Sequence, residues 1–219
     1  MIRAKHHPWA ERIFRLYIDY LFRKNFNRIV LIGHVPTIDP ALPMLLLPNH
    51  TTWWDGFFIY LLNREIFRRQ IYMMMLEEQL RRYWFFSKIG CYSISPTSVR
   101  ASLEYTQKIL RSGSTLVCMY PQGELVSTHA PIIYKHGVEW ICRGQRVQLI
   151  QTAMKIEYSH KPKPDVFIKL SNVLTNEAAA VKVSDLQNWH RELLQQLITG
   201  IISKNHERIL FDDSFLKKD

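Results

Sequence analysis

The sequence predicts an α/β fold in which helices flank a mostly parallel sheet. The chain has 219 residues, of which 47% are hydrophobic, so it is long enough for one sizeable core. Short apolar runs that are typical of buried strands alternate with segments of helical periodicity through most of the chain. We find no internal repeat and no low-complexity segment.

Residues 9–28 form the first predicted element, an amphipathic helix. Its apolar residues recur at helical spacing: Trp9, Ile13, Leu16, Tyr17, Tyr20 and Leu21. A largely basic polar stripe runs between them: Arg12, Arg15, Asp19 and Arg23. Two interpretations stay open, a helix at a membrane interface and an ordinary core-packing helix. The only candidate domain boundary lies near residue 28, between an N-terminal helix (1–28) and an α/β domain (29–219).

The α/β domain begins with strand-like runs that end in polar residues. Ile29–Ile32 is a short apolar run, and the run 43–47 ends at Pro48 and is followed by His50. A short helix is expected over residues 52–63 and a buried strand over Ile71–Met75, although its methionines could also line an acyl pocket. Residues 91–95 alternate like a strand.

The second half continues this alternation. A helix over residues 98–112 is closed by Gly113, and a strand over 115–120 ends at Pro121. Strands are expected over 147–157 and 165–171, separated by a turn at 159–164. Ser184 and Gln187 form a capping-box pattern that predicts the start of the last helix. One face of this helix is expected to carry Leu186, Trp189, Leu193, Leu197 and Ile201.

Net charge and cysteine content limit the classes of partner and of structural site that we expect. A net charge of +10 indicates an anionic partner, but no nucleic-acid-binding module is recognisable, so we expect no nucleic acid. Cys91, Cys118 and Cys142 form no CxxC pair, so we expect neither a disulfide framework nor a metal site. Without an apolar run of about 18 residues, we expect a cytoplasmic protein that is peripheral on the cytoplasmic face of the membrane.

The stretch 48-PNHTTWWDGF-57 carries the chemistry. His50 follows a predicted strand, where α/β proteins usually place catalytic groups, and Asp55 follows about one helical turn later. A carboxylate there can hold one imidazole nitrogen and leave the other as a base. No serine or cysteine nucleophile is built into the stretch, so His50 would take a proton from a substrate hydroxyl directly. The alternative is a structural turn histidine beside a helical aspartate.

Four segments in the right order resemble the phospholipid/glycerol acyltransferase family, which includes the lysophosphatidic acid acyltransferases. Asn49, His50 and Asp55 match its N-H-x4-D motif, and 120-YPQGEL-125 resembles its F-P-E-G-T-R block. The segment 90-GCYSISP-96 is similar to its G-x-I-F-I-D-R segment, and 134-YKHG-137 to its F-K-x-G. The resemblance spans roughly residues 30–155.

This resemblance implies a glycerolipid acyltransferase-like fold and a role in lipid metabolism such as phospholipid biosynthesis. The co-substrate would be an acyl thioester, acyl-CoA or acyl-carrier protein, with no separate cofactor, and the acceptor a lipid with a free hydroxyl. His50 would be the general base and Asp55 its partner. Gly123 would let backbone N–H groups approach the reacting thioester, positioned by Tyr120 and Pro121.

The substrate-binding residues implied by the resemblance also include Asn49. Two interpretations of Trp53 and Trp54 stay open. They could line the acyl or lipid site, since tryptophan suits the membrane interface, or one could pack in the core while the other is exposed.

The chain departs from the family at three cationic positions that hold a phosphate. Leu125 and Pro96 stand where the family has arginine, and 73-MMMLEEQ-79 offers no lysine. Gln122 replaces the usual glutamate, and Glu124 brings a carboxylate two positions later. We infer an acceptor with a neutral or sugar-like head, such as a glycolipid, lysolipid or terpenoid glycoside. Alternatively, a phosphate binds to other cations, Arg100, Lys135 and Arg143, although ordinary solvated surface charges are the simpler interpretation of these three.

Two other functions stay open. In a thioesterase or lipid hydrolase, water would replace the acceptor or Cys118 would act as the nucleophile, although its place in an apolar strand indicates burial. A non-catalytic lipid-binding protein on the same scaffold would have no need for a paired base.

Overall fold

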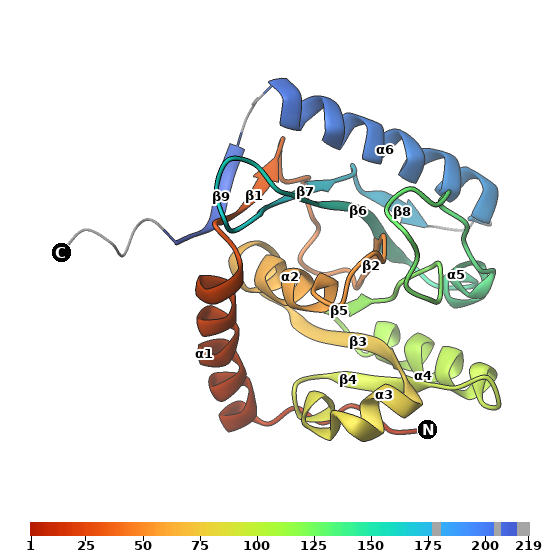
Figure 1. Ribbon diagram of the computed structural model, residues 1–219. Coiled ribbons are helices and arrows are strands. Elements are labelled where there is room, and N and C mark those ends of the chain that lie inside the picture. The colour runs from red at the N-terminus through yellow and green to blue at the C-terminus, as the bar shows by residue number, and fades with distance from the viewer. Residues whose placement is uncertain (177–180, 204–206, 214–219) are drawn as a thin grey trace.

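In the computed structural model, a twisted sheet separates two layers of helices (Figure 1). The structure describes residues 1–176, 181–203 and 207–213. The strand order is β4-β3-β5-β2-β6-β7-β1-β9, and β8 pairs with β6 beside this path. The strands are β1 (Arg28–Ile32), β2 (Met44–Pro48), β3 (Gln70–Leu76), β4 (Cys91–Ile94), β5 (Thr115–Cys118), β6 (Val147–Glu157), β7 (Asp165–Leu170), β8 (Leu174–Asn176) and β9 (Glu207–Asp212).

The predicted mostly parallel sheet is confirmed. The central strands β4, β3, β5, β2 and β6 pair in parallel, and β1 pairs in parallel with β7. Among the strands that the structure describes, three pairs are antiparallel: β6 with β7, β6 with β8, and β1 with β9. The first follows from the connection at 159–164, which is too short for the crossover that a parallel pair needs.

Within the described residues, six α-helices cover the two faces: α1 (Pro8–Asn25), α2 (Asp55–Leu62), α3 (Glu77–Arg82), α4 (Val99–Arg111), α5 (Gly137–Cys142) and α6 (Val183–Ser203). A π-helix (Asn63–Phe67) extends α2, and a 3₁₀-helix (Trp84–Lys88) follows α3. Alternate strand residues divide between the layers. Leu46 packs with α1 and α2, whereas Leu45 and Leu47 pack with α4, α5 and α6. Strands β2 and β5 are therefore buried on both faces, which explains why their sequences contain few polar residues.

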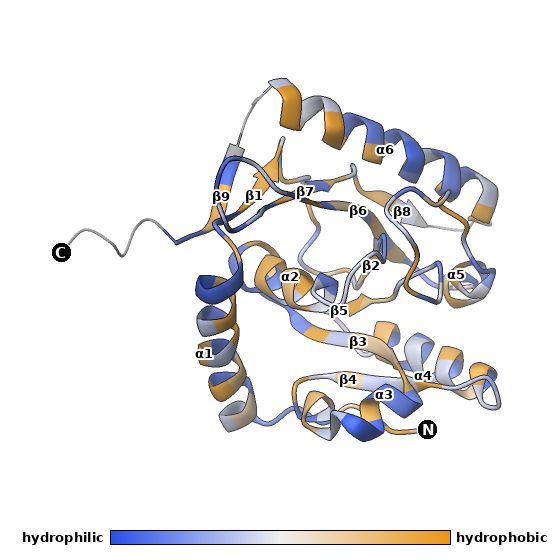
Figure 2. Cartoon of the chain, in the orientation of Figure 1, coloured by the Kyte–Doolittle hydropathy of each residue, from blue (hydrophilic) through white to orange (hydrophobic). Residues whose placement is uncertain are grey.

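Helix α1 packs one face on the core and exposes a second apolar face. Its buried residues are Ala10, Phe14, Ile18 and Phe22. Of the residues that sequence periodicity singled out, Leu21 packs against the core, and the others are about half exposed or more: Trp9, Ile13, Leu16, Tyr17 and Tyr20. In Figure 2 the last turn of α1 is hydrophilic, and hydrophobic residues recur along the turns before it. The division of the chain at residue 28 stays a prediction.

The start of α6 differs from the predicted capping box. The helix begins at Val183, and the Gln187 side chain accepts a hydrogen bond from the Tyr134 N–H (2.7 Å) instead of reaching back to Ser184. Trp189 was expected on the buried face but is 44% exposed, whereas His190 is fully buried. Tertiary contacts with the 127–136 segment thus override the local pattern.

No helix among the described residues is long and apolar enough to cross a membrane.

Candidate active site

His50 and Asp55 are held together at the carboxyl end of β2. His50 Nδ1 lies 2.9 Å from Asp55 Oδ2, and the His50 side chain is 21% exposed. Because a carboxylate only accepts hydrogen bonds, Nδ1 carries the hydrogen and Nε2 keeps its lone pair. None of the described residues bonds to Nε2. The pair therefore has the geometry of a base with its orienting group.

Asp55 is buried, and its carboxylate organises the turn before α2. Oδ2 also accepts the backbone N–H groups of Thr51 (2.7 Å) and Thr52 (2.9 Å), and Oδ1 accepts the Thr52 hydroxyl (2.7 Å). With the His50 contact, the carboxylate accepts four hydrogen bonds while only 1% exposed. This network compensates for the burial of the charge and fixes the imidazole.

Asn49 fastens the end of β2 to β6. Its Nδ2 donates to the Met154 carbonyl (3.0 Å), and its Oδ1 accepts the Met154 N–H (2.8 Å). The Asn49 N–H donates to the Thr152 carbonyl (3.2 Å), which continues the ladder between the strands. These contacts give Asn49 a structural role one residue before His50.

The second segment, which follows β5, packs directly on the histidine. The Tyr120 ring stacks on the His50 ring, with 3.9 Å between centroids and 18° between planes. Gln122, which is 4% exposed, accepts the His50 N–H at its Oε1 (2.8 Å). The Val126 N–H donates to the His50 carbonyl (3.0 Å). Both backbone polar groups of His50 are thus bound by the 120–126 segment.

Gly123 makes the turn of this segment possible. Its φ of +76° lies in the left-handed region, and its N–H donates to the Tyr120 carbonyl (3.0 Å). A Cβ at this position would lie 2.9 Å from Lys135 Cδ. The Lys135 N–H donates to the Pro121 carbonyl (2.8 Å), and its ammonium lies 4.0 Å from Glu124. The structure therefore brings Tyr120, Pro121, Gln122, Gly123, Glu124 and Lys135 together beside His50.

Trp53 and Trp54 line an aromatic groove of about 500 Å³. The groove lies between α1, the first turns of α2 and residues 82–86, and we call it the aromatic groove from here on. Its lining is Ile13, Phe14, Tyr17, Leu21, Trp53, Trp54, Phe57, Arg82, Tyr83, Trp84, Phe85 and Phe86. Sequence reasoning missed the last four, although 83-YWFF-86 was a visible signal.

Two other residues that the sequence singled out, Arg100 and Cys118, take no part in the chemistry of this site. Arg100 on α4 has a side chain that is 87% exposed and pairs with Glu104. Cys118 is fully buried, and burial raises the pKa of its thiol well above the usual value. A buried thiol of raised pKa supplies little thiolate, so it is a poor nucleophile.

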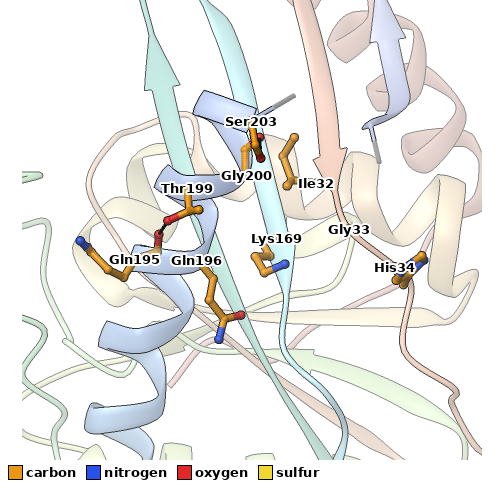
Figure 3. Close-up of a pocket in the computed structure, with 9 residues that line it drawn as sticks. All are labelled: Ile32, Gly33, His34, Lys169, Gln195, Gln196, Thr199, Gly200 and Ser203. Carbon is orange, nitrogen blue, oxygen red and sulfur yellow. Dashed lines mark hydrogen bonds between the residues drawn. The ribbon is translucent and has the colours of Figure 1, made fainter. Parts of the chain in front are cut away.

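A second cavity, of about 450 Å³, lies beneath the C-terminal half of α6 and beside the ends of β1 and β7 (Figure 3). Its lining includes Lys169, His34 and Thr199. None of its lining residues belongs to the His50 site, so the cavity is separate from the candidate active site.

Comparisons with known proteins show the family and the fold. A family model described as Acyltransferase matches residues 28–167. The fold is similar to the crystal structure of the 1-acyl-sn-glycerophosphate (LPA) acyltransferase PlsC from Thermotoga maritima. The two share 17% sequence identity with a TM-score of 0.61, over 87% of this chain and 77% of that one. No curated protein matches the chain.

Proposed function

The chain belongs to the acyltransferase family, and we propose that it moves a fatty acyl group from an acyl thioester to a hydroxyl of a lipid acceptor. The observation that carries this proposal is the His50–Asp55 pair, in which a buried carboxylate holds Nδ1 (2.9 Å) and leaves Nε2 as a base. The donor would be acyl-CoA or acyl-carrier protein.

In the proposed mechanism, His50 Nε2 removes the proton of the acceptor hydroxyl as its oxygen attacks the thioester carbon. Asp55 stabilises the imidazolium that forms. The tetrahedral intermediate then expels the thiolate, which takes the proton from Nε2. Backbone N–H groups beside the Gly123 turn would stabilise the oxyanion. The Gly123 N–H already donates to the Tyr120 carbonyl and Pro121 has no N–H, so we propose the N–H groups of Gln122 and Glu124 for this role.

The aromatic groove supports a lipid substrate. It reaches from Trp53, three residues after His50, to Ile13 and Tyr17 on the exposed apolar face of α1. An acyl chain in this groove would bury apolar surface against aromatic rings, and each Å² of apolar surface removed from water stabilises the complex by about 25 cal/mol. The groove would therefore lead a lipid from the surface of the protein to the base.

The same face of α1 supports contact with a membrane surface. Trp9, Leu16 and Tyr20 are between 52% and 65% exposed, and Arg12 and Arg15 are exposed beside them. Apolar rings with neighbouring arginines suit an interface with anionic lipid.

The membrane contact can be tested without truncation, which would remove core residues such as Phe14 and Phe22. Replacing Trp9, Leu16 and Tyr20 by serine should reduce sedimentation with anionic vesicles while leaving the melting temperature unchanged. Unchanged sedimentation would refute the proposed membrane face.

For the acceptor, we propose a neutral or sugar-like head. Of the three cations that the sequence offers as phosphate ligands, Lys135 lies against the 120–124 turn, and its charge is partly offset by Glu124. Arg100 is bound to Glu104, and Arg143 ends α5.

The central experiment mixes the protein with labelled acyl-CoA or acyl-carrier protein and a panel of lysolipids and glycolipids, and detects acylated products by mass spectrometry. We expect transfer that His50→Ala abolishes. Free fatty acid as the sole product would favour a hydrolase. Binding of lipid without consumption of either donor would favour a non-catalytic lipid-binding protein.

A further inference from the structure

A buried polar cluster lies under α6 and takes no part in the chemistry proposed above. It consists of His190, Tyr134, Gln151 and Thr152, which are each less than 5% exposed. His190 comes from the middle of α6, Tyr134 from the 127–136 segment, and Gln151 and Thr152 from β6. Apolar side chains could fill the same space without the cost of burying polar groups, so the cluster needs a physical reason.

Its hydrogen bonds define one arrangement of the ring atoms. Gln151 Nε2 donates to Tyr134 Oη (3.0 Å), so the Tyr134 hydroxyl is free to donate to His190 Nδ1 (2.6 Å). Gln151 Nε2 also donates to the Leu186 carbonyl (2.6 Å). His190 therefore carries its hydrogen on Nε2, which is buried near the Thr152 backbone without the geometry of a hydrogen bond.

Two short routes lead from this cluster to the catalytic histidine. In the first, the residue after Tyr134, Lys135, donates its N–H to the Pro121 carbonyl (2.8 Å). Gln122, which follows Pro121 in the chain, accepts the His50 N–H at its side-chain oxygen (2.8 Å). The segment between Gln122 and Tyr134 is thus tied at one end to His50 and at the other to α6.

The second route runs through β6. Thr152, whose backbone lies beside the His190 ring, accepts the Asn49 N–H at its carbonyl (3.2 Å). Asn49 directly precedes His50. The cluster therefore contacts both segments that hold His50, although its hydrogen bonds do not include His50 itself.

We propose that His190 and Tyr134 are positioning residues for His50. They fix the position of the 120–136 segment relative to the adjoining ends of β2 and β6. Because His50 is bonded to both parts, its imidazole stays aligned with the Tyr120–Gly123 turn. This inference rests on the proposed role of His50 as the base. A buried hydrogen-bond network suits the task, because it specifies a single geometry where apolar packing tolerates several.

The test compares Tyr134→Phe with a matched control, Tyr92→Phe. Tyr92 is also fully buried, and its hydroxyl bonds to Thr106 on α4 (2.7 Å). Each change deletes one buried hydroxyl, which makes two hydrogen bonds at Tyr134 and one at Tyr92, so both should lower the melting temperature, Tyr134→Phe by more. The kinetics are therefore compared at a temperature at which both variants are folded. Tyr134→Phe should lower kcat by about 10- to 100-fold, the effect of misplacing a catalytic group by up to 1 Å, with KM for the donor unchanged. Tyr92→Phe should leave kcat within about twofold.

Two substitutions at His190 test whether restoring an acceptor for the Tyr134 hydroxyl restores kcat. Asn places an oxygen close to the position of Nδ1 and can accept the Tyr134 hydroxyl, whereas Leu cannot. We expect kcat to be higher in His190→Asn than in His190→Leu. Equal kcat in these two variants, or equal losses of kcat in Tyr134→Phe and Tyr92→Phe, would overturn the positioning role.

A readout that needs no activity separates this proposal from the proposed function. Hydrogen exchange followed by mass spectrometry reports the amides of His50 and Val126, which are both bonded across the two segments. Exchange in peptides covering these residues should accelerate in Tyr134→Phe and stay unchanged in Tyr92→Phe. Unaltered exchange in Tyr134→Phe would refute the positioning role even if the wild type shows transfer. Faster exchange in Tyr134→Phe, together with a wild type that shows no transfer, would leave the positioning role intact and refute the proposed function.

Discussion

Replacing Asp55 by asparagine tests the proposed mechanism most directly. The carboxylate accepts three hydrogen bonds at Oδ2, from His50 Nδ1 and from the N–H groups of Thr51 and Thr52, and one at Oδ1, from the Thr52 hydroxyl. An asparagine oxygen at the Oδ2 position can keep the first three. Its NH₂ group would face the Thr52 hydroxyl, which can turn to accept. The substitution therefore removes the charge and preserves the shape.

The two consequences differ in size. Three charge-assisted hydrogen bonds become neutral ones, so we expect a loss of stability of about 2 kcal/mol. The imidazolium that forms in the transition state also loses its counter-charge. The same change in a catalytic triad lowers kcat about 10⁴-fold, and we expect about 10³- to 10⁴-fold here, or roughly 4 to 5.5 kcal/mol.

The assay measures kcat for acyl transfer and the free energy of unfolding in urea for the wild type, Asp55→Asn, His50→Ala and the double variant. If the two residues act as a unit, the double variant should be no slower than His50→Ala. A kcat within about threefold of the wild type in Asp55→Asn, with stability lowered as expected, would show that Asp55 only shapes the turn. Fully additive losses would likewise refute the pairing.

Three further predictions concern His190, Cys118 and Lys135. Burial lowers the pKa of His190 from 6.5 to about 4, so the unfolded chain takes up the proton first, and stability should fall between pH 6.5 and 4 by about 3 kcal/mol. Urea unfolding at both pH values checks this, and an unchanged pH slope in His190→Asn would contradict it. Cys118→Ala should keep transfer within about twofold, because the buried thiol is not the nucleophile; a tenfold loss would revive the hydrolase. Lys135→Met should leave KM for a neutral acceptor unchanged, whereas a tenfold rise for phosphorylated acceptors alone would show that Lys135 binds phosphate.

Several elements were predictable because their signals are local. The apolar runs that became β2 and β5 are buried on both faces, so their sequences contain few polar residues. The change from apolar to polar residues after each run therefore marks the carboxyl end of the strand. His50 and Asp55 are five residues apart, so their contact depends on one turn of chain and follows from sequence spacing.

Other features were wrong or invisible in the sequence because they depend on packing partners. Both faces of α1 are apolar, and only its neighbours decide that Phe14 and Phe22 enter the core while Trp9 and Tyr20 stay exposed. Periodicity placed Trp189 on the buried face of α6, but the polar partners from β6 and the 127–136 segment bury His190 instead.

The sequence by itself determined the alternating α/β architecture and the pairing of His50 with Asp55, because both arise from interactions between residues close along the chain. Only the tertiary structure decided what surrounds that pair. The stacking of Tyr120 on His50, the Gln122 bond to its backbone and the groove between α1 and residues 82–86 join segments dozens of residues apart. Local patterns carry no information on such contacts, which form only when the sheet brings β2 and β5 side by side.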